Sequence, residues 1–167
     1  VTSYRVFEKR DSLSSIKASY STLSKYDTFP ESLKVISDGN PIYNVAVQYW
    51  TQNGLPFQLF QVISLTNQDD ISKEYRSQKQ IIERFNRTLK YYYRPKGGFT
   101  SLDNANNYMV LFATYNNFLR PNKSLDWKTP VELPELDGIS NMPNKWITLL
   151  KIAKDFADPY TSFKKYN

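Results

Sequence analysis

One acidic side chain stands among basic ones in the segment Ile81–Lys90. Residues three or four apart share a helix face, so Glu83 would lie beside four cations: Arg76, Lys79, Arg87 and Lys90. A lone carboxylate ringed by cations suggests a metal ion held next to a polyanion, which points towards chemistry on nucleic acid. The alternative is a pair of salt bridges from Glu83 to Lys79 and Arg87, each contributing about 0.3–0.5 kcal/mol.

A second carboxylate, Asp38, directly follows the apolar segment Leu33–Ser37, which has the pattern of a short buried strand. The carboxyl end of a strand lies at the edge where open α/β sheets bind ligands. The alternative is that Asp38 caps the helix that begins near Pro41, or takes part in an Asp-Gly turn with Gly39.

Composition limits which chemistry is available. The 167 residues suffice for one domain with a core, and the net charge of +6 makes nucleic acid the first partner to consider. Cysteine and histidine are both absent, which excludes disulfides, thiolate zinc sites and Ser-His-Asp triads. A metal must therefore use oxygen ligands, which favours Mg²⁺ or Mn²⁺.

Targeting signals are not evident in the sequence. No apolar run reaches about 18 residues and no signal-peptide pattern is present, so we expect a cytoplasmic protein without a membrane partner. The first residue is valine, and we therefore expect the chain to begin inside a longer reading frame.

Apolar periodicity predicts the elements that must position the two acids. The predicted strands are Tyr4–Glu8, Leu33–Ser37 and Phe57–Ile63. The first predicted helix is capped by Asp11 or Ser12 and carries the apolar positions Leu13, Ile16, Tyr20 and Leu23. The other predicted helices are Pro41–Gln52, Ser72–Tyr93, Leu102–Phe118 and Lys145–Phe156, with an extended segment at Leu119–Gly138. The long helix should pack on the sheet through a mostly apolar stripe of Tyr75, Gln78, Ile82, Phe85 and Leu89. This order implies an α/β fold with a partly parallel sheet.

Four motifs in order resemble those of DDE-type transposases and retroviral-type integrases. Asp38, a gap of 44 residues and then Glu83 resemble the second and third acids of that family. Tyr115–Pro121 and Lys128–Glu132 resemble its YN..RP and TP.E segments. The resemblance covers about residues 30 to 135 and is nearest to bacterial insertion-sequence transposases, whose catalytic domain has a ribonuclease-H-like fold.

The resemblance implies that Asp38 and Glu83 are catalytic and ligate Mg²⁺ or Mn²⁺. Lys90, seven residues after Glu83, matches a basic family position that often contacts the DNA end. Lys79, four residues before Glu83, matches another position that is commonly polar or basic, and we expect it to bind nucleic acid as well. From the helix geometry we add two phosphate contacts: Arg76 and Arg87.

The chain departs from the family at its start. The family's first acid lies on the first of five strands, ordered 3-2-1-4-5, whereas Tyr4–Glu8 corresponds to the third strand. We therefore expect a ribonuclease-H-like fold that lacks its first two strands, with an incomplete mixed sheet, and a chain that is inactive alone. Glu8 and Asp11 are poor substitutes for the missing Asp. We expect a partial catalytic domain at residues 1–118, with residues 119–167 as an extended segment and helix packed on it.

Three functions remain open from the sequence. The leading one is a segment of a transposase or integrase that cuts and joins DNA, as a homo-oligomer on transposon ends and target DNA in a bacterial nucleoid. The second is a non-catalytic, basic nucleic-acid-binding remnant of such a gene, and the third is a structural protein that binds no nucleic acid. Tyr91–Lys96 mixes aromatic and basic residues, as base-stacking surfaces do, or else is a helix end that packs its tyrosines on the domain.

Overall fold

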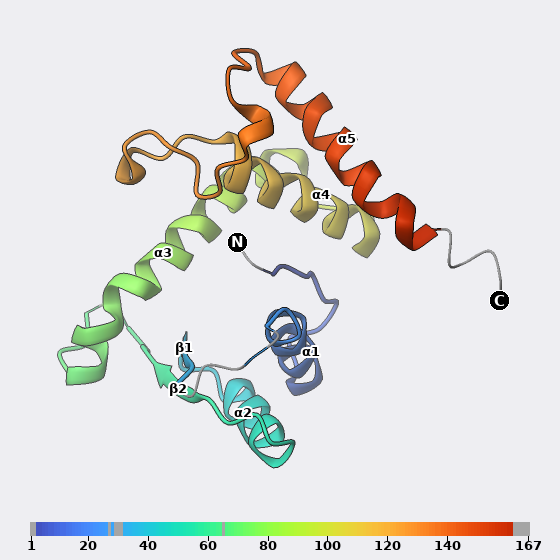
Figure 1. The fold of residues 1–167 in the computed structure, drawn as a ribbon. Coiled ribbons are helices and arrows are strands. Elements are labelled where there is room, and N and C mark those ends of the chain that lie inside the picture. The colour runs from blue at the N-terminus through green and yellow to red at the C-terminus, as the bar shows by residue number, and fades with distance from the viewer. Residues whose placement is uncertain (1–2, 27, 29–31, 65, 162–167) are drawn as a thin grey trace. The chain divides into compact units, whose positions relative to one another are not determined.

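The computed structural model describes residues 3–26, 28, 32–64 and 66–161. Within these residues it contains five α-helices and one two-stranded sheet (Figure 1). In chain order they are α1 (Ser12–Leu23), β1 (Lys34–Ser37), α2 (Ile42–Gln52), β2 (Gln58–Gln61), α3 (Asp70–Tyr93), α4 (Leu102–Thr114) and α5 (Met142–Thr161). The short turns are η1 (Arg94–Lys96), η2 (Tyr115–Leu119), η3 (Lys123–Leu125) and η4 (Pro134–Leu136). The chain divides into two compact units between Val110 and Leu111; the predicted boundary after residue 118 stays a prediction.

The sheet brings two strand ends to one edge. β1 and β2 are parallel, with Lys34 opposite Gln58 and Ser37 opposite Gln61. The backbone amide of Val62 donates to the carbonyl of Ser37 at 3.0 Å, which continues the ladder past the end of β2. Parallel strands point their carboxyl ends the same way, so the residues that follow β1 and β2 are neighbours. Both strands were predicted, although β2 is shorter than expected.

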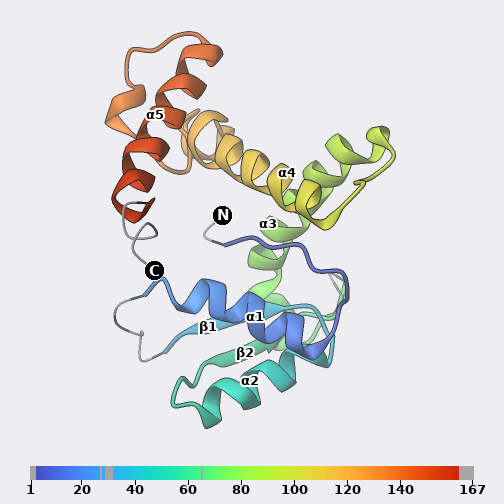
Figure 2. The same cartoon turned by 90° about the vertical axis from the view of Figure 1, so that its right-hand side faces the viewer.

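Helices cover both faces of this strand pair. α1 and α2 lie on one face and α3 on the other, as both views show (Figures 1 and 2). α1 packs on α2 through the stacked rings of Tyr20 and Trp50, whose centroids are 6.0 Å apart. α3 meets the sheet through Tyr75, whose ring centroid lies 4.4 Å from that of Phe60. Val62, fully buried, belongs to the small core at this end of the sheet.

The predicted strand at Tyr4–Glu8 is wrong, because the structure has no strand there. The side chain of Asn106 in α4 occupies the backbone groups that a partner strand would pair. The amide of Val6 donates to Asn106 Oδ1 at 2.9 Å, and Asn106 Nδ2 donates to the Val6 carbonyl at 3.4 Å. A strand needs a neighbouring strand, and among the described residues the free edge of β1 has none.

The face that α3 buries also differs from the prediction. Its buried residues are Ser72, Tyr75 and Lys79, whereas Gln78 is exposed and 53% of Ile82 is exposed. The difference arises because the strands are much shorter than the helix. Strands of four residues span about 13 Å, whereas a helix of 24 residues spans about 36 Å. The sheet therefore covers only the first turns of α3, and the later turns extend past it.

The C-terminal unit has its own small core. Leu119, Leu136 and Leu149 form a buried cluster, and four partly buried side chains pack against it: Tyr115, Phe118, Leu133 and Trp146. The helix predicted to reach Phe118 continues from α4 into the π-helical turn η2, and the predicted extended segment contains η3 and η4. Residues 162–167 of the predicted C-terminal segment lie outside the described residues. None of the described helices has both the length and the apolar character that a membrane span requires.

Candidate metal and nucleic-acid site

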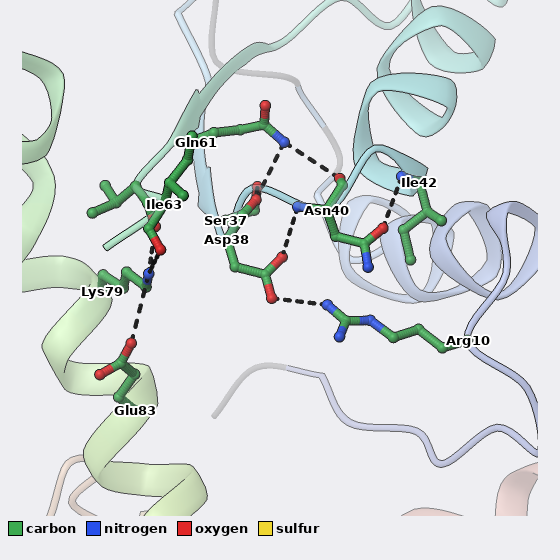
Figure 3. Close-up of polar contacts among 10 residues, drawn as sticks. Arg10, Ser37, Asp38, Asn40, Ile42, Gln61, Ile63, Lys79 and Glu83 are labelled. Atoms are coloured by element: carbon green, nitrogen blue, oxygen red, sulfur yellow. Dashed lines mark hydrogen bonds and ion pairs between the residues drawn. The ribbon is translucent and has the colours of Figure 1, made fainter. Parts of the chain in front are cut away.

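Asp38 is the first residue after β1, and both of its carboxylate oxygens are engaged. Oδ1 accepts the backbone amide of Asn40 at 3.2 Å, which closes an Asp-Gly turn, and Oδ2 accepts Nη2 of Arg10 at 2.8 Å (Figure 3). Oδ1 of Asn40 in turn accepts the backbone amide of Ile42 at 3.1 Å. The N-cap residue of α2 is Pro41, so Asp38 does not cap this helix. Asp38 raises the pKa of the Arg10 guanidinium as its main hydrogen-bond partner, and Tyr43 adds to this effect.

The turn that holds Asp38 is tied to β2. Nε2 of Gln61 donates to the carbonyls of Asp38 at 3.2 Å and Asn40 at 3.3 Å (Figure 3). Gly39 lies so close to Ile63 that a Cβ at this position would be 2.9 Å from Ile63 Cγ1. These contacts fix the Asp38 turn against the end of β2.

Glu83 reaches the same edge of the sheet through a buried lysine. Lys79 is only 8% exposed, and its ammonium donates to the carbonyl of Val62 and, at 3.3 Å, to that of Ile63. The same nitrogen lies 3.7 Å from Oε1 of Glu83, one helical turn further along α3 (Figure 3). The predicted Lys79–Glu83 salt bridge is therefore present. No Glu83–Arg87 ion pair occurs in the described part of the chain.

The two acids therefore lie at one edge of the sheet, each with a protein cation as counter-charge. Their side chains are 46% and 36% exposed, so solvent and ligands reach both Asp38 and Glu83. Mg²⁺ binds to protein through one or two carboxylates when substrate phosphates complete its shell, and Asp38 and Glu83 each carry oxygen ligands of this kind. Among the described residues no cluster of three or more potential metal-binding side chains occurs. A metal here would replace Arg10 and Lys79 as the partner of these acids.

The four predicted phosphate-binding cations separate into two pairs. Arg76 and Lys79, near the sheet, donate to backbone carbonyls: Arg76 to that of Asn67 and Lys79 to those after β2. Arg87 and Lys90 are exposed and line a groove that begins at Glu83. The structure thus brings Arg87 and Lys90 together with Glu83 on an open surface, and it places the ammonium of Lys79 inside the fold.

Sequence reasoning did not find Arg10 or Gln61. Arg10 is 28 residues from Asp38 and belongs to a segment without regular structure, so no local spacing signals their contact. Gln61 is a strand residue whose side chain turns to the neighbouring loop, and only the parallel register indicates that position.

The YN..RP and TP.E segments form hydrogen bonds that stabilise the C-terminal unit. In the turn at Tyr115–Pro121, Nη1 of Arg120 donates to Oδ1 of Asn116 at 3.2 Å. The amide of Val131 in the TP.E segment donates to the carbonyl of Asn117 at 2.9 Å. The YN..RP and TP.E segments therefore hold each other in the C-terminal unit.

Comparison with known families bears on the class of domain. Residues 69–130 match the model of the integrase core domain. The match includes Glu83, the four cations and the YN..RP segment, and it begins after Asp38. It supports an integrase-like or transposase-like catalytic core at a coarse level, a class of domain with a ribonuclease-H-like fold that typically uses divalent metals. No curated protein and no solved structure gave a significant match to the chain.

Proposed function

We propose that this chain is part of a DDE-type transposase or integrase that cuts and joins DNA strands. The observation that carries the proposal is the position of Asp38 and Glu83 at one edge of the sheet, joined through Gln61, the end of β2 and Lys79. The integrase core match over residues 69–130 supports it independently. Kinship with bacterial insertion-sequence enzymes, a truncated sheet and assembly as a homo-oligomer on DNA ends belong to the same proposal.

The residues divide the work by position. Asp38 and Glu83 would hold Mg²⁺ or Mn²⁺ through carboxylate oxygens, while Arg87 and Lys90 hold the phosphates of the strand beside them. Metal ions bound in such sites stabilise the attacking and leaving oxygens of an in-line displacement at phosphorus. Lys79 holds Glu83 against the end of β2, and Gln61 fixes the Asp38 turn. These contacts keep the two carboxylates in place before substrate arrives.

The test is strand transfer by the native protein that carries this chain. Glu83→Gln should abolish strand transfer, because the neutral amide is a poor ligand for a hard divalent ion, and should leave DNA affinity nearly unchanged. Glu74→Gln is the matched control, since Glu74 is an exposed acid on the same helix. Strand transfer at the wild-type rate by the Glu83 variant would exclude Glu83 as a metal ligand.

One observation favours the non-catalytic alternative for the chain alone. Both acids are neutralised by protein cations, and the described residues contain no third acid beside them. A nucleic-acid-binding remnant would bind DNA with a strong salt dependence, and its affinity would not rise when Mg²⁺ replaces chelator. Affinity that rises with Mg²⁺ and falls in Asp38→Asn would favour the catalytic core.

A further inference from the structure

A groove runs along the C-terminal half of α3, away from the sheet. It begins at Glu83, ends at Arg94 and Pro95, and has a volume of about 950 Å³, at the upper end of the range for ligand sites. Arg94 is eleven positions after Glu83, which corresponds to roughly 16 Å along a helix. The groove is therefore long enough to follow a polymer that extends from the candidate metal site.

Three cations follow one side of the groove. Arg87, Lys90 and Arg94 all line it, and their spacing of three or four residues places them on one helix face. In the described part of the chain, none of these three side chains has an ion pair or a hydrogen bond. Arg76 and Lys79 earlier in the helix differ, because protein carbonyls occupy them. The groove thus offers unpaired positive charge to a polyanion, with Glu83 as its single acid.

Two tyrosines supply ring surface beside these cations. Tyr91 is 74% exposed and Tyr92 47% exposed, and their ring centroids are 5.4 Å apart at an interplanar angle of 82°. Tyr93 packs on the domain instead. Its ring stacks on that of Phe99 with centroids 5.4 Å apart, and Phe99 contacts Tyr108. Packing of the helix end on the domain therefore accounts for Tyr93, whereas most of the Tyr91 side chain is exposed to solvent.

Cations that follow a backbone, next to exposed aromatic rings, are the combination that binds single-stranded nucleic acid. A duplex offers phosphates to Arg87, Lys90 and Arg94, but its bases are already stacked on each other and cannot cover Tyr91. An unpaired strand satisfies both sets of groups.

We propose that this groove binds the unpaired nucleotides of a DNA strand, with phosphates on Arg87, Lys90 and Arg94 and a base stacked on Tyr91. The inference rests on the proposed function for the choice of DNA, and it adds that the strand leading away from Glu83 is single-stranded.

The test compares a single-stranded oligonucleotide of about ten nucleotides with a blunt duplex, by fluorescence anisotropy of the purified chain in chelator. Tyr91→Leu should weaken single-strand binding about fivefold or more and change duplex binding by less than about twofold, because only the unpaired strand uses the ring. Tyr91→Phe keeps the ring and should bind as the wild type does, which separates loss of stacking from loss of fold.

Two variants that each remove one positive charge complete the experiment. Arg94→Gln should weaken binding of both DNA forms, whereas Arg84→Gln, the same change on the same helix outside the groove, should not. Equal loss of single-strand and duplex binding in Tyr91→Leu, or no loss of either, would overturn the proposal. Because no metal is present, the result is independent of strand transfer, so this inference and the proposed function can fail separately.

Discussion

Lys79 is the residue on which the geometry of Glu83 depends. It is buried between α3 and the end of β2, and its ammonium serves the carbonyls of Val62 and Ile63 as well as the Glu83 carboxylate. A buried ammonium is stable only with such partners, because burial removes the water that would solvate its charge. Lys79 therefore stabilises the fold and orients Glu83 with the same contacts.

Replacement of Lys79 by Met should lower the free energy of unfolding by about 1–3 kcal/mol, since buried acceptors would lose their donor. Urea denaturation measures this change. The matched control is Lys73→Met, because Lys73 is exposed and its ion pair with the exposed Asp70 is long, at 3.9 Å. An exposed pair of this kind contributes little, so the free energy of unfolding of Lys73→Met should stay within about 0.5 kcal/mol of the wild-type value. Equal midpoints for Lys79→Met and wild type would show that these contacts do not stabilise the fold.

At the scale of elements, the two halves of α3 have different surroundings. Its first turns pack on the sheet and its last turns line the groove. The helix starts at a defined cap, where the Asp69 side chain accepts the backbone amide of Ser72 at 2.8 Å. Hydrogen bonds from Ser72 hold the pKa of Asp69 below its ordinary value. The cap fixes where the helix begins and hence where Lys79 and Glu83 lie.

This lowered pKa predicts a pH dependence. The charged cap stabilises the folded chain fully above about pH 4, the ordinary pKa of an Asp, and that stabilisation is lost as the pH falls through the lower folded value. Asp69→Asn keeps a capping oxygen but does not titrate. The wild type should therefore lose thermal stability relative to Asp69→Asn below about pH 4, measured as unfolding midpoints by circular dichroism. Midpoints that change in parallel would contradict this role of Asp69.

Local patterns predicted most of the elements and failed where distant residues decide. The Asp11 cap, β1 and the long helix follow from side chains within a few residues of each other. The strand prediction at Tyr4–Glu8 is wrong because an alternating pattern does not supply a partner strand. The prediction of the buried face of α3 is wrong because that burial depends on the length of the strands beneath the helix. Glu83 and Lys79 pair at helical spacing, whereas no local pattern links Asp38 to Arg10.

At the scale of the whole molecule, 22 basic and 16 acidic residues give a net charge of +6. This charge favours encounter with nucleic acid. It does not show which cations would bind the nucleic acid, because some of them, such as Arg76 and Lys79, donate to backbone carbonyls within the fold. The integrase core match covers residues from both compact units, because it continues past Val110 to residue 130. The motifs predicted the class of domain, and the structure distinguishes the cations that support the fold from those that face solvent.

The groove predicts the salt dependence of single-strand binding. Three phosphate contacts by Arg87, Lys90 and Arg94 should give a slope of log K against log salt concentration of roughly −2, and removal of one cation should reduce its magnitude by about 0.7. Titrations of Arg94→Gln and Arg84→Gln at several salt concentrations measure this. A slope that Arg94→Gln leaves unchanged would show that Arg94 does not contact phosphate.

The most direct test of the central claim, that Asp38 and Glu83 share one divalent-metal site, is paramagnetic line broadening by Mn²⁺ in the NMR spectrum of the isotope-labelled chain. The amide signals of Asp38, Gly39 and Glu83 should broaden together at the lowest Mn²⁺ concentrations. Asp38→Asn and Glu83→Gln should each abolish the broadening at both positions. Broadening confined to other acids such as Glu74, or unchanged in these variants, would contradict the account.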